Sequence, residues 1–227
     1  MTGAVLIQHA VGRHEELLRS TMELHAQYAR QHDIVYQAIL GPLNILCRPP
    51  TWWKWILIHR AIQDGFQIVV WLDADCIIVD PREDISCSLH PRNPPVGMVW
   101  HQSRYYERQG LHNSGVVVAR ACVETVDYIW DLWATGKGPY RSINGRQPTW
   151  NDNFAVVLID EEFPGKVQTI DNKWNHGWAS PSPAPVVHGF HGAGVEGTLA
   201  SIQKLLPEVQ KRYHETEGRA AALCQEI

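Results

Sequence analysis

The chain has 227 residues, 44% of them hydrophobic, and a formal net charge of −4. This length suits one sizeable α/β domain, and the slightly acidic balance excludes the basic surface that nucleic acid as a main partner would need. Five scattered cysteines predict a reducing compartment without structural zinc. We expect no transmembrane segment and no signal peptide, and therefore a cytoplasmic protein.

The first elements form a strand–helix–strand pattern. Apolar residues 4–9 predict a buried strand, helical spacing follows over residues 13–31, and residues 34–39 predict a second strand. Such a unit gives a parallel pair of strands with a right-handed crossover. A further helix is expected over residues 51–63, with Thr51 as its N-cap.

The most informative stretch is the apolar run of residues 68–72, which ends at Asp73 and Asp75. Its length and its flanking Gly65 and Pro81 indicate a strand buried on both faces. Side chains alternate along a strand, so the two carboxylates can point the same way. Ligands of open α/β sheets lie at this end of the strands. Two adjacent carboxylates there favour Mg²⁺ or Mn²⁺ bound together with substrate phosphates.

Later segments continue the α/β pattern. We expect strands over residues 96–100, 112–120 and 167–170, and helices over residues 122–134 and from about 152 onward. The tail, 199–227, has helical periodicity interrupted at Pro207, and its apolar face is expected to pack on the domain.

Three segments in order resemble the GT-A glycosyltransferases, most closely the glycogenin-like and the galactosyl-, mannosyl- and xylosyltransferase families. They are Trp71-Leu72-Asp73-Ala74-Asp75, Asn113-Ser114-Gly115 followed by an apolar run, and His191-Gly192-Ala193-Gly194. The resemblance implies a single Rossmann-like domain over residues 1–198, with a mostly parallel central sheet flanked by helices. Residues 1–80 would form its nucleotide-binding half and residues 81–198 its sugar and acceptor half.

The resemblance also implies the site. Asp73, Asp75 and His191 would bind Mn²⁺ or Mg²⁺, with His188 as the alternative to His191. Asp152 and Asn153 would act on the transferred sugar. The nucleotide-sugar, a UDP-sugar as the expected donor and GDP-mannose as the alternative, would contact the following residues: His9, Tyr36, Lys54, Asp73, Asn113, Ser114, Gly115 and Gly194. The sugar would pass to a sugar, glycan or protein acceptor with retention of configuration.

Two departures from the family pattern keep other functions open. Asn153 stands where the family has Gln, and no lysine follows His191 closely. A non-catalytic relic of the fold that binds sugar nucleotides is therefore one alternative. The other is a metal-dependent phosphohydrolase with Asp73 as nucleophile, because such phosphatases also carry Asp-x-Asp after an apolar strand. In those enzymes the motif lies on the first strand, whereas about 70 residues precede it here.

Overall fold

The computed structural model describes residues 2–43, 48–102, 110–135, 152–177, 181–190 and 193–225. Its main sheet has six strands in the order β2-β1-β3-β6-β5-β7. Only β6, among these, runs antiparallel to its neighbours, so the sheet is mostly parallel, as predicted. The strands are β1 (Thr2–Ala10), β2 (Ile34–Leu40), β3 (Phe66–Leu72), β5 (Val96–His101), β6 (Leu111–Arg120) and β7 (Val167–Ile170).

The predicted strand–helix–strand unit is confirmed. Helix α1 (Glu15–Gln31) connects β1 to β2, and these two strands pair in parallel from Ala4 opposite Ile34 to Ala10 opposite Leu40. Strand β3 pairs in parallel with the other edge of β1. The carboxyl ends of β1 and β3 therefore meet at one edge of the sheet, where β6 begins because it runs in the opposite direction.

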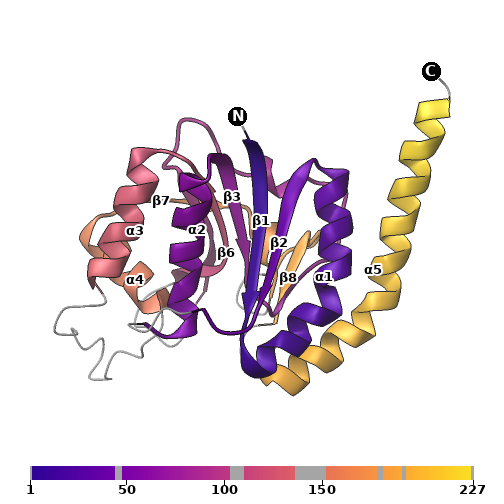
Figure 1. Cartoon of the computed structure of the whole chain (residues 1–227), viewed down its shortest axis with the longest axis horizontal. Helices are drawn as coiled ribbons and strands as arrows, with labels where there is room; N and C mark the ends of the chain where they lie inside the picture. The colour runs from indigo at the N-terminus through magenta and orange to yellow at the C-terminus, as the bar shows by residue number, and fades with distance from the viewer. Residues whose placement is uncertain are drawn as a thin grey trace.

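Helices cover both faces of the sheet (Figure 1). Helices α2 (Trp53–Gln63), α3 (Val123–Thr135) and α4 (Asp152–Glu162) lie on one face, and α1 lies on the other with α5 (Gly194–Gln225) beyond it. Strand β1 shows why two cores form: Leu6 points into the core with α1, whereas Val5 and Ile7 point into the core with α2 and α3. This alternation makes a three-layer α/β domain.

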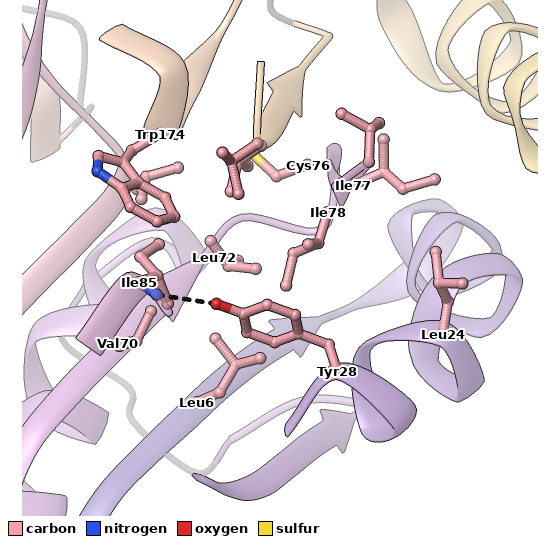
Figure 2. Close-up of a cluster of buried hydrophobic side chains, with 14 of the residues drawn as sticks. Leu6, Leu24, Tyr28, Val70, Leu72, Cys76, Ile77, Ile78, Ile85 and Trp174 are labelled. Carbon is pink, nitrogen blue, oxygen red and sulfur yellow. Dashed lines mark hydrogen bonds between the residues drawn. The ribbon is translucent and has the colours of Figure 1, made fainter. Parts of the chain in front are cut away.

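A small two-stranded sheet, which the sequence did not indicate, follows the carboxylate motif. Strand β4 (Cys76–Ile78) pairs antiparallel with β8 (Val187–Gly189) and adds buried aliphatic side chains to the core that α1 covers. Figure 2 shows Tyr28 of α1 in this core, where its hydroxyl accepts a hydrogen bond of 2.8 Å from the backbone N–H of Ile85. The segment after β4 is thereby fixed against α1.

Helix α5 continues through Pro207, where the sequence predicted an interruption. Its buried side chains Ile202, Val209 and Tyr213 join the core on the α1 side, so packing keeps the helix continuous although proline lacks one N–H donor. The end of α5 extends past the body of the domain (Figure 1). Within the described residues, no helix is long and apolar enough to cross a membrane.

Candidate active site

A pocket of about 350 Å³ lies where β1 and β3 end and where β6, α2 and α4 begin. This is the edge at which open α/β sheets bind ligands. Most of the residues predicted to form the site line this pocket, and they come from all five elements or the turns that follow them. They are His9, Lys54, Asp73, Asp75, Asn113, Asp152 and Asn153.

Lys54, on the first turn of α2, forms the centre of a buried charged cluster. Its Nζ lies 3.0 Å from Asp73 Oδ1 and 3.3 Å from Asp152 Oδ2. It also donates to the carbonyl oxygen and the Oγ of Ser114, at 2.9 and 3.1 Å. Burial disfavours the ammonium ion, but the two carboxylates together outweigh burial and raise the pKa of Lys54. Lys54 is therefore charged at neutral pH, and protein groups already occupy its donors.

The two carboxylates of the Asp-x-Asp motif are placed by a turn rather than by strand alternation. Asp73 follows β3 directly, and the N–H of Cys76 donates to its carbonyl at 3.0 Å, which puts Asp75 inside the turn. Both side chains nevertheless line the pocket. Trp71 orients the first of them, because its Nε1 donates to Asp73 Oδ1 at 2.7 Å.

Asp152, the first residue of α4, is only 2% exposed. Its Oδ2 accepts from Trp55 Nε1 at 3.2 Å and from Ser114 Oγ at 2.7 Å, and it also faces Lys54. Burial raises the pKa of Asp152, against the opposing charge of Lys54. All of these contacts end on Oδ2, and Oδ1 makes no bond within the described part of the chain. The carboxylate thus presents one oxygen to the pocket that it lines.

Ser114 and Gly115 lie beneath the pocket and do not line it. Ser114 is fully buried, and its backbone N–H donates to Asn153 Oδ1 at 2.8 Å. Because an N–H can only donate, this contact identifies the amide oxygen of Asn153 and holds the start of α4 against β6. The carbonyl of Gly115 accepts the N–H of Asp73 at 2.8 Å. Both residues therefore position pocket side chains.

Asn113 lines the pocket from β6, and its amide orientation is also fixed. Its Oδ1 accepts from the N–H of Gly115 at 2.8 Å and from Nδ2 of Asn175 at 3.0 Å. The backbone N–H of Gly115 can only donate, so it identifies the oxygen of Asn113, and Nδ2 of Asn175 donates to the same oxygen. Within the described part of the chain no group accepts from Nδ2 of Asn113, so this NH₂ group can donate to a ligand in the pocket.

Of the three remaining residues expected to contact the nucleotide-sugar, only His9 lines the pocket. Its Nε2 donates to the carbonyl of Gly41 at 2.8 Å, and burial lowers its pKa, so its neutral ring presents Nδ1 as an acceptor. Tyr36 packs against the core on the α1 side, and Gly194 begins α5 with φ of +70°. Neither is among the residues that line the pocket.

A neutral polar cluster lies behind the carboxylate turn, on the opposite face of the sheet. Gln8 Oε1 accepts from His25 Nδ1 at 2.6 Å and from the Tyr36 hydroxyl at 2.8 Å. The Nε2 of His25 accepts the N–H of Ile78 at 3.1 Å, and burial lowers the pKa of His25 to about 3. Gln8 Nε2 lies 3.5 Å from the carbonyl of Asp73. This cluster holds the backbone on both sides of the turn.

The predicted metal ligands are only partly described. Asp73 and Asp75 line the pocket, whereas His191 lies outside the described residues. The alternative, His188 in β8, contacts the tilted rings of His176 and Phe190, at centroid distances of 4.9 and 4.3 Å, and does not line the pocket. Among the described residues, no three His, Cys, Asp or Glu side chains group as a metal site.

The charges of the pocket nevertheless fit a divalent cation. The lining contains one lysine, Lys54, and three aspartates, Asp73, Asp75 and Asp152, so the formal charge of these residues is −2. A diphosphate would be repelled by this surface unless a cation accompanied it. Two carboxylates are hard oxygen ligands, and Mg²⁺ commonly uses one or two carboxylates with substrate phosphates. These donors would hold Mn²⁺ or Mg²⁺ together with a phosphorylated ligand.

Sequence reasoning missed the residues that orient the pocket side chains. Trp55 and Trp71 look like core residues, because nothing in an apolar pattern shows that an indole N–H meets a carboxylate. Asn175 lies 62 residues after its partner Asn113. The available signal was that residues 171–178, which include Asn175, resemble the late Phe/Trp-Asn segment of the GT-A families.

The sequence matches no family model and has no significant match among curated proteins. Solved structures do resemble the chain. A glycosyltransferase involved in glycosylation of the major capsid of PBCV-1 is 14% identical with a TM-score of 0.67, over 88% of this chain and 98% of that chain. The galactosyltransferase LgtC, in complex with donor and acceptor sugar analogues, is 12% identical with a TM-score of 0.56, over 91% and 95%.

Mouse xyloside xylosyltransferase 1 in its apo form is 9% identical with a TM-score of 0.53, over 85% of this chain and 99% of that chain. The match extends over nearly the whole length of each of these proteins, so the similarity concerns the complete domain. The chain has the GT-A fold of these glycosyltransferases, as the sequence predicted.

Proposed function

We propose that this protein is a metal-dependent glycosyltransferase that moves a sugar from a nucleotide-sugar, a UDP-sugar as the expected donor, to an acceptor. The observation that carries the proposal is the pocket itself. It combines two carboxylates of the Asp-x-Asp turn with a donor amide from Asn113 and a buried carboxylate from Asp152. This combination lies at the edge where open α/β sheets bind ligands, which supports the proposal.

The described residues divide the proposed work between them. Asp73 and Asp75 would hold Mn²⁺ or Mg²⁺, with His191 as a further predicted ligand. When bound, the cation would act as a Lewis acid that stabilises negative charge on the diphosphate. Asn113 would donate to an oxygen of the donor sugar, and Asp152 Oδ1 would accept from a sugar hydroxyl. Both are held by buried partners, which favours one orientation of the sugar.

Lys54 has an indirect role in this proposal. Its ammonium group is already surrounded by Asp73, Asp152 and Ser114, so it neutralises carboxylate charge and keeps the two aspartates together. Contact between Lys54 and the nucleotide-sugar, which the resemblance implied, would require it to release one of these partners.

The transfer would break the bond between the anomeric carbon and the diphosphate oxygen and form a bond from that carbon to an acceptor hydroxyl. The acceptor proton would pass to the departing diphosphate. Retention of configuration is part of the proposal, and it follows from the families that the sequence resembles. The anomeric configuration of the first product, measured by proton NMR before mutarotation, tests this point directly.

Hydrolysis of UDP-glucose, UDP-galactose, UDP-xylose and GDP-mannose with and without Mn²⁺ tests the activity. We expect slow, Mn²⁺-dependent release of UDP from at least one UDP-sugar, and its loss in Asp75→Asn. Asp127→Asn, at an exposed position of α3, is the matched control. Release of phosphate from p-nitrophenyl phosphate without any donor hydrolysis would instead favour the phosphohydrolase. Mn²⁺-dependent UDP binding without turnover, acceptors included, would favour the non-catalytic relic.

A further inference from the structure

Asn175 does not line the pocket, but its side chain donates to Asn113, which does. Asn175 belongs to η4 (Asn172–Asn175) and is completely buried. Its Nδ2 donates to Asn113 Oδ1 at 3.0 Å, and its own carbonyl lies 3.2 Å from Nε2 of His101. The short helix is capped by Asp171, whose side chain accepts from the N–H of Lys173. Asn175 is thus a fixed donor behind a pocket residue.

The order of the strands assigns Asn113 to one side of the pocket. Strand β3, which leads into the carboxylate turn, lies between β1 and β6. His9 lines the pocket from β1, and Asn113 lines it from β6 together with Asp152 and Asn153 at the start of α4. A nucleotide-sugar that extends across the pocket with its diphosphate at the central carboxylates would place its nucleoside and its sugar on opposite sides. The sugar falls on the β6 side if the nucleoside falls on the β1 side.

We propose that Asn175 is a positioning residue for the donor sugar. Together with the N–H of Gly115, it holds the amide oxygen of Asn113 in place, so that the NH₂ group of Asn113 points toward the pocket. The inference rests on the proposed function. It predicts a ligand group that accepts hydrogen bonds, such as a sugar hydroxyl or ring oxygen, opposite Asn113. The binding of UDP alone does not depend on this contact, so Asn175 acts on the sugar and not on the nucleotide.

Two substitutions separate this role from simple packing. In Asn175→Asp the new carboxylate has nearly the same shape but can only accept, so it repels Asn113 Oδ1 and favours the reversed amide. In Asn175→Ala the N–H of Gly115 still holds the oxygen of Asn113 in place. An orienting role therefore makes Asn175→Asp the more harmful change. A packing role makes Asn175→Ala the more harmful one, because it leaves a cavity.

The measurement is the dissociation constant of a UDP-sugar divided by that of UDP, both with Mn²⁺, by calorimetric titration. The sugar nucleotide used is the one of UDP-glucose, UDP-galactose and UDP-xylose that the unaltered chain hydrolyses fastest. We expect this ratio to rise about tenfold in Asn175→Asp and about threefold in Asn175→Ala. Asn172→Asp, in the same short helix but with its amide donating to Pro181, is the control with an unchanged ratio.

The inference is wrong if both variants keep the ratio of the unaltered chain, or if Asn175→Ala raises the ratio more than Asn175→Asp does. It is also wrong if the binding of UDP alone weakens as much as the binding of the UDP-sugar. Should Asn175→Asp not fold, a cycle of Asn113→Ala and Asn175→Ala decides. Asn175→Ala must then lose its effect on the ratio once Asn113 is alanine, and additive effects contradict the inference. Failure of the unaltered chain to bind UDP would overturn the proposed function itself, a result distinct from all of these.

Discussion

Two buried polar clusters meet the carboxylate turn from opposite faces of the sheet. On the α2 side, Lys54 forms ion pairs with the side chains of Asp73 and Asp152. On the α1 side, Gln8 joins His25 and Tyr36, and every member is neutral. The charged cluster fixes side chains that line the pocket, whereas the neutral cluster fixes the backbone beneath them.

This division has a physical reason. A buried ion pair carries a desolvation cost of several kcal/mol per ion, so a scaffold contact is made more cheaply by neutral hydrogen bonds. Charges are useful where a ligand must be bound through them. The charged cluster therefore lies at the proposed binding surface, and the neutral cluster lies behind it. Each of the following substitutions changes one cluster and leaves the other intact.

The largest effect is expected from Lys54→Met. It leaves the carboxylates of Asp73 and Asp152 without their counter-ion, which should lower the free energy of unfolding by about 3–5 kcal/mol. Burial raises the pKa of Asp152 and the charge of Lys54 opposes this rise, so in Lys54→Met the carboxyl group takes up a proton more readily as the pH falls. The loss of stability should therefore be greater at pH 8 than at pH 5. Urea unfolding at both pH values measures it. The control Lys166→Met removes a more exposed ion pair with Asp131 and should lower the free energy of unfolding by under about 1 kcal/mol. Equal losses in Lys54→Met and Lys166→Met would contradict the account.

The neutral cluster should respond to acid through His25. Its pKa is about 3 in the folded chain against 6.5 in the unfolded chain, so between these values only the unfolded chain takes up the proton. Stability should then fall as the pH falls through this window, by up to about 1.4 kcal/mol per pH unit. Urea unfolding from pH 6 to pH 4 should show a shallower decline in His25→Gln. His214→Gln, at an exposed position of α5, should keep the steeper decline.

Comparison of Trp55→Phe with Trp53→Phe distinguishes a hydrogen bond to a carboxylate from a hydrogen bond to a neutral carbonyl. It removes the donor to Asp152 and should cost about 1.5–3 kcal/mol of folding free energy. Trp53→Phe, the neighbouring control, removes a donor to the carbonyl of Arg48 and should cost about 0.5–1.5 kcal/mol. Thermal and urea unfolding give both values. A cost for Trp53→Phe that equals or exceeds the other would show that the charge of Asp152 is not what matters.

The smallest effect is expected from Tyr36→Phe. Loss of its bond to Gln8 should cost about 0.5–1.5 kcal/mol of folding free energy and leave the affinity for UDP unchanged. Weaker UDP binding would show that Tyr36 contacts the nucleotide, as the resemblance implied. Tyr28→Phe, whose hydroxyl bonds both Glu83 and Ile85, should cost more without affecting UDP.

The fold was predictable from the sequence where the signal is local. The apolar runs before Gly41 and Asp73 give β2 and β3, and the helical spacing between β1 and β2 gives α1. The GT-A resemblance then ordered these elements. It could not give the turn at Ala74, which depends on a backbone bond from Cys76 to Asp73. It could not show that α5 passes through Pro207, because packing against α1 decides that.

The sequence indicated which residues line the pocket, but it did not indicate the hydrogen bonds that hold them there. Lys54, Asn113 and Asp152 were named, and they do line one pocket. Their hydrogen bonds depend on contacts between residues far apart in sequence, such as Trp55 with Asp152, 97 residues later. Ser114 shows the same limit, since its motif is visible in the sequence but its burial beneath the pocket is not.

Calorimetric titration of UDP with and without Mn²⁺, on the unaltered chain, Asp75→Ala and Asp127→Ala, tests the central claim most directly. We expect Mn²⁺-dependent binding in the unaltered chain and in Asp127→Ala, weakened at least tenfold in Asp75→Ala, about 1.4 kcal/mol or more. The assignment of this pocket would be contradicted if the affinity for UDP were the same without Mn²⁺ and in Asp75→Ala. It would also be contradicted if neither UDP nor GDP bound under any condition.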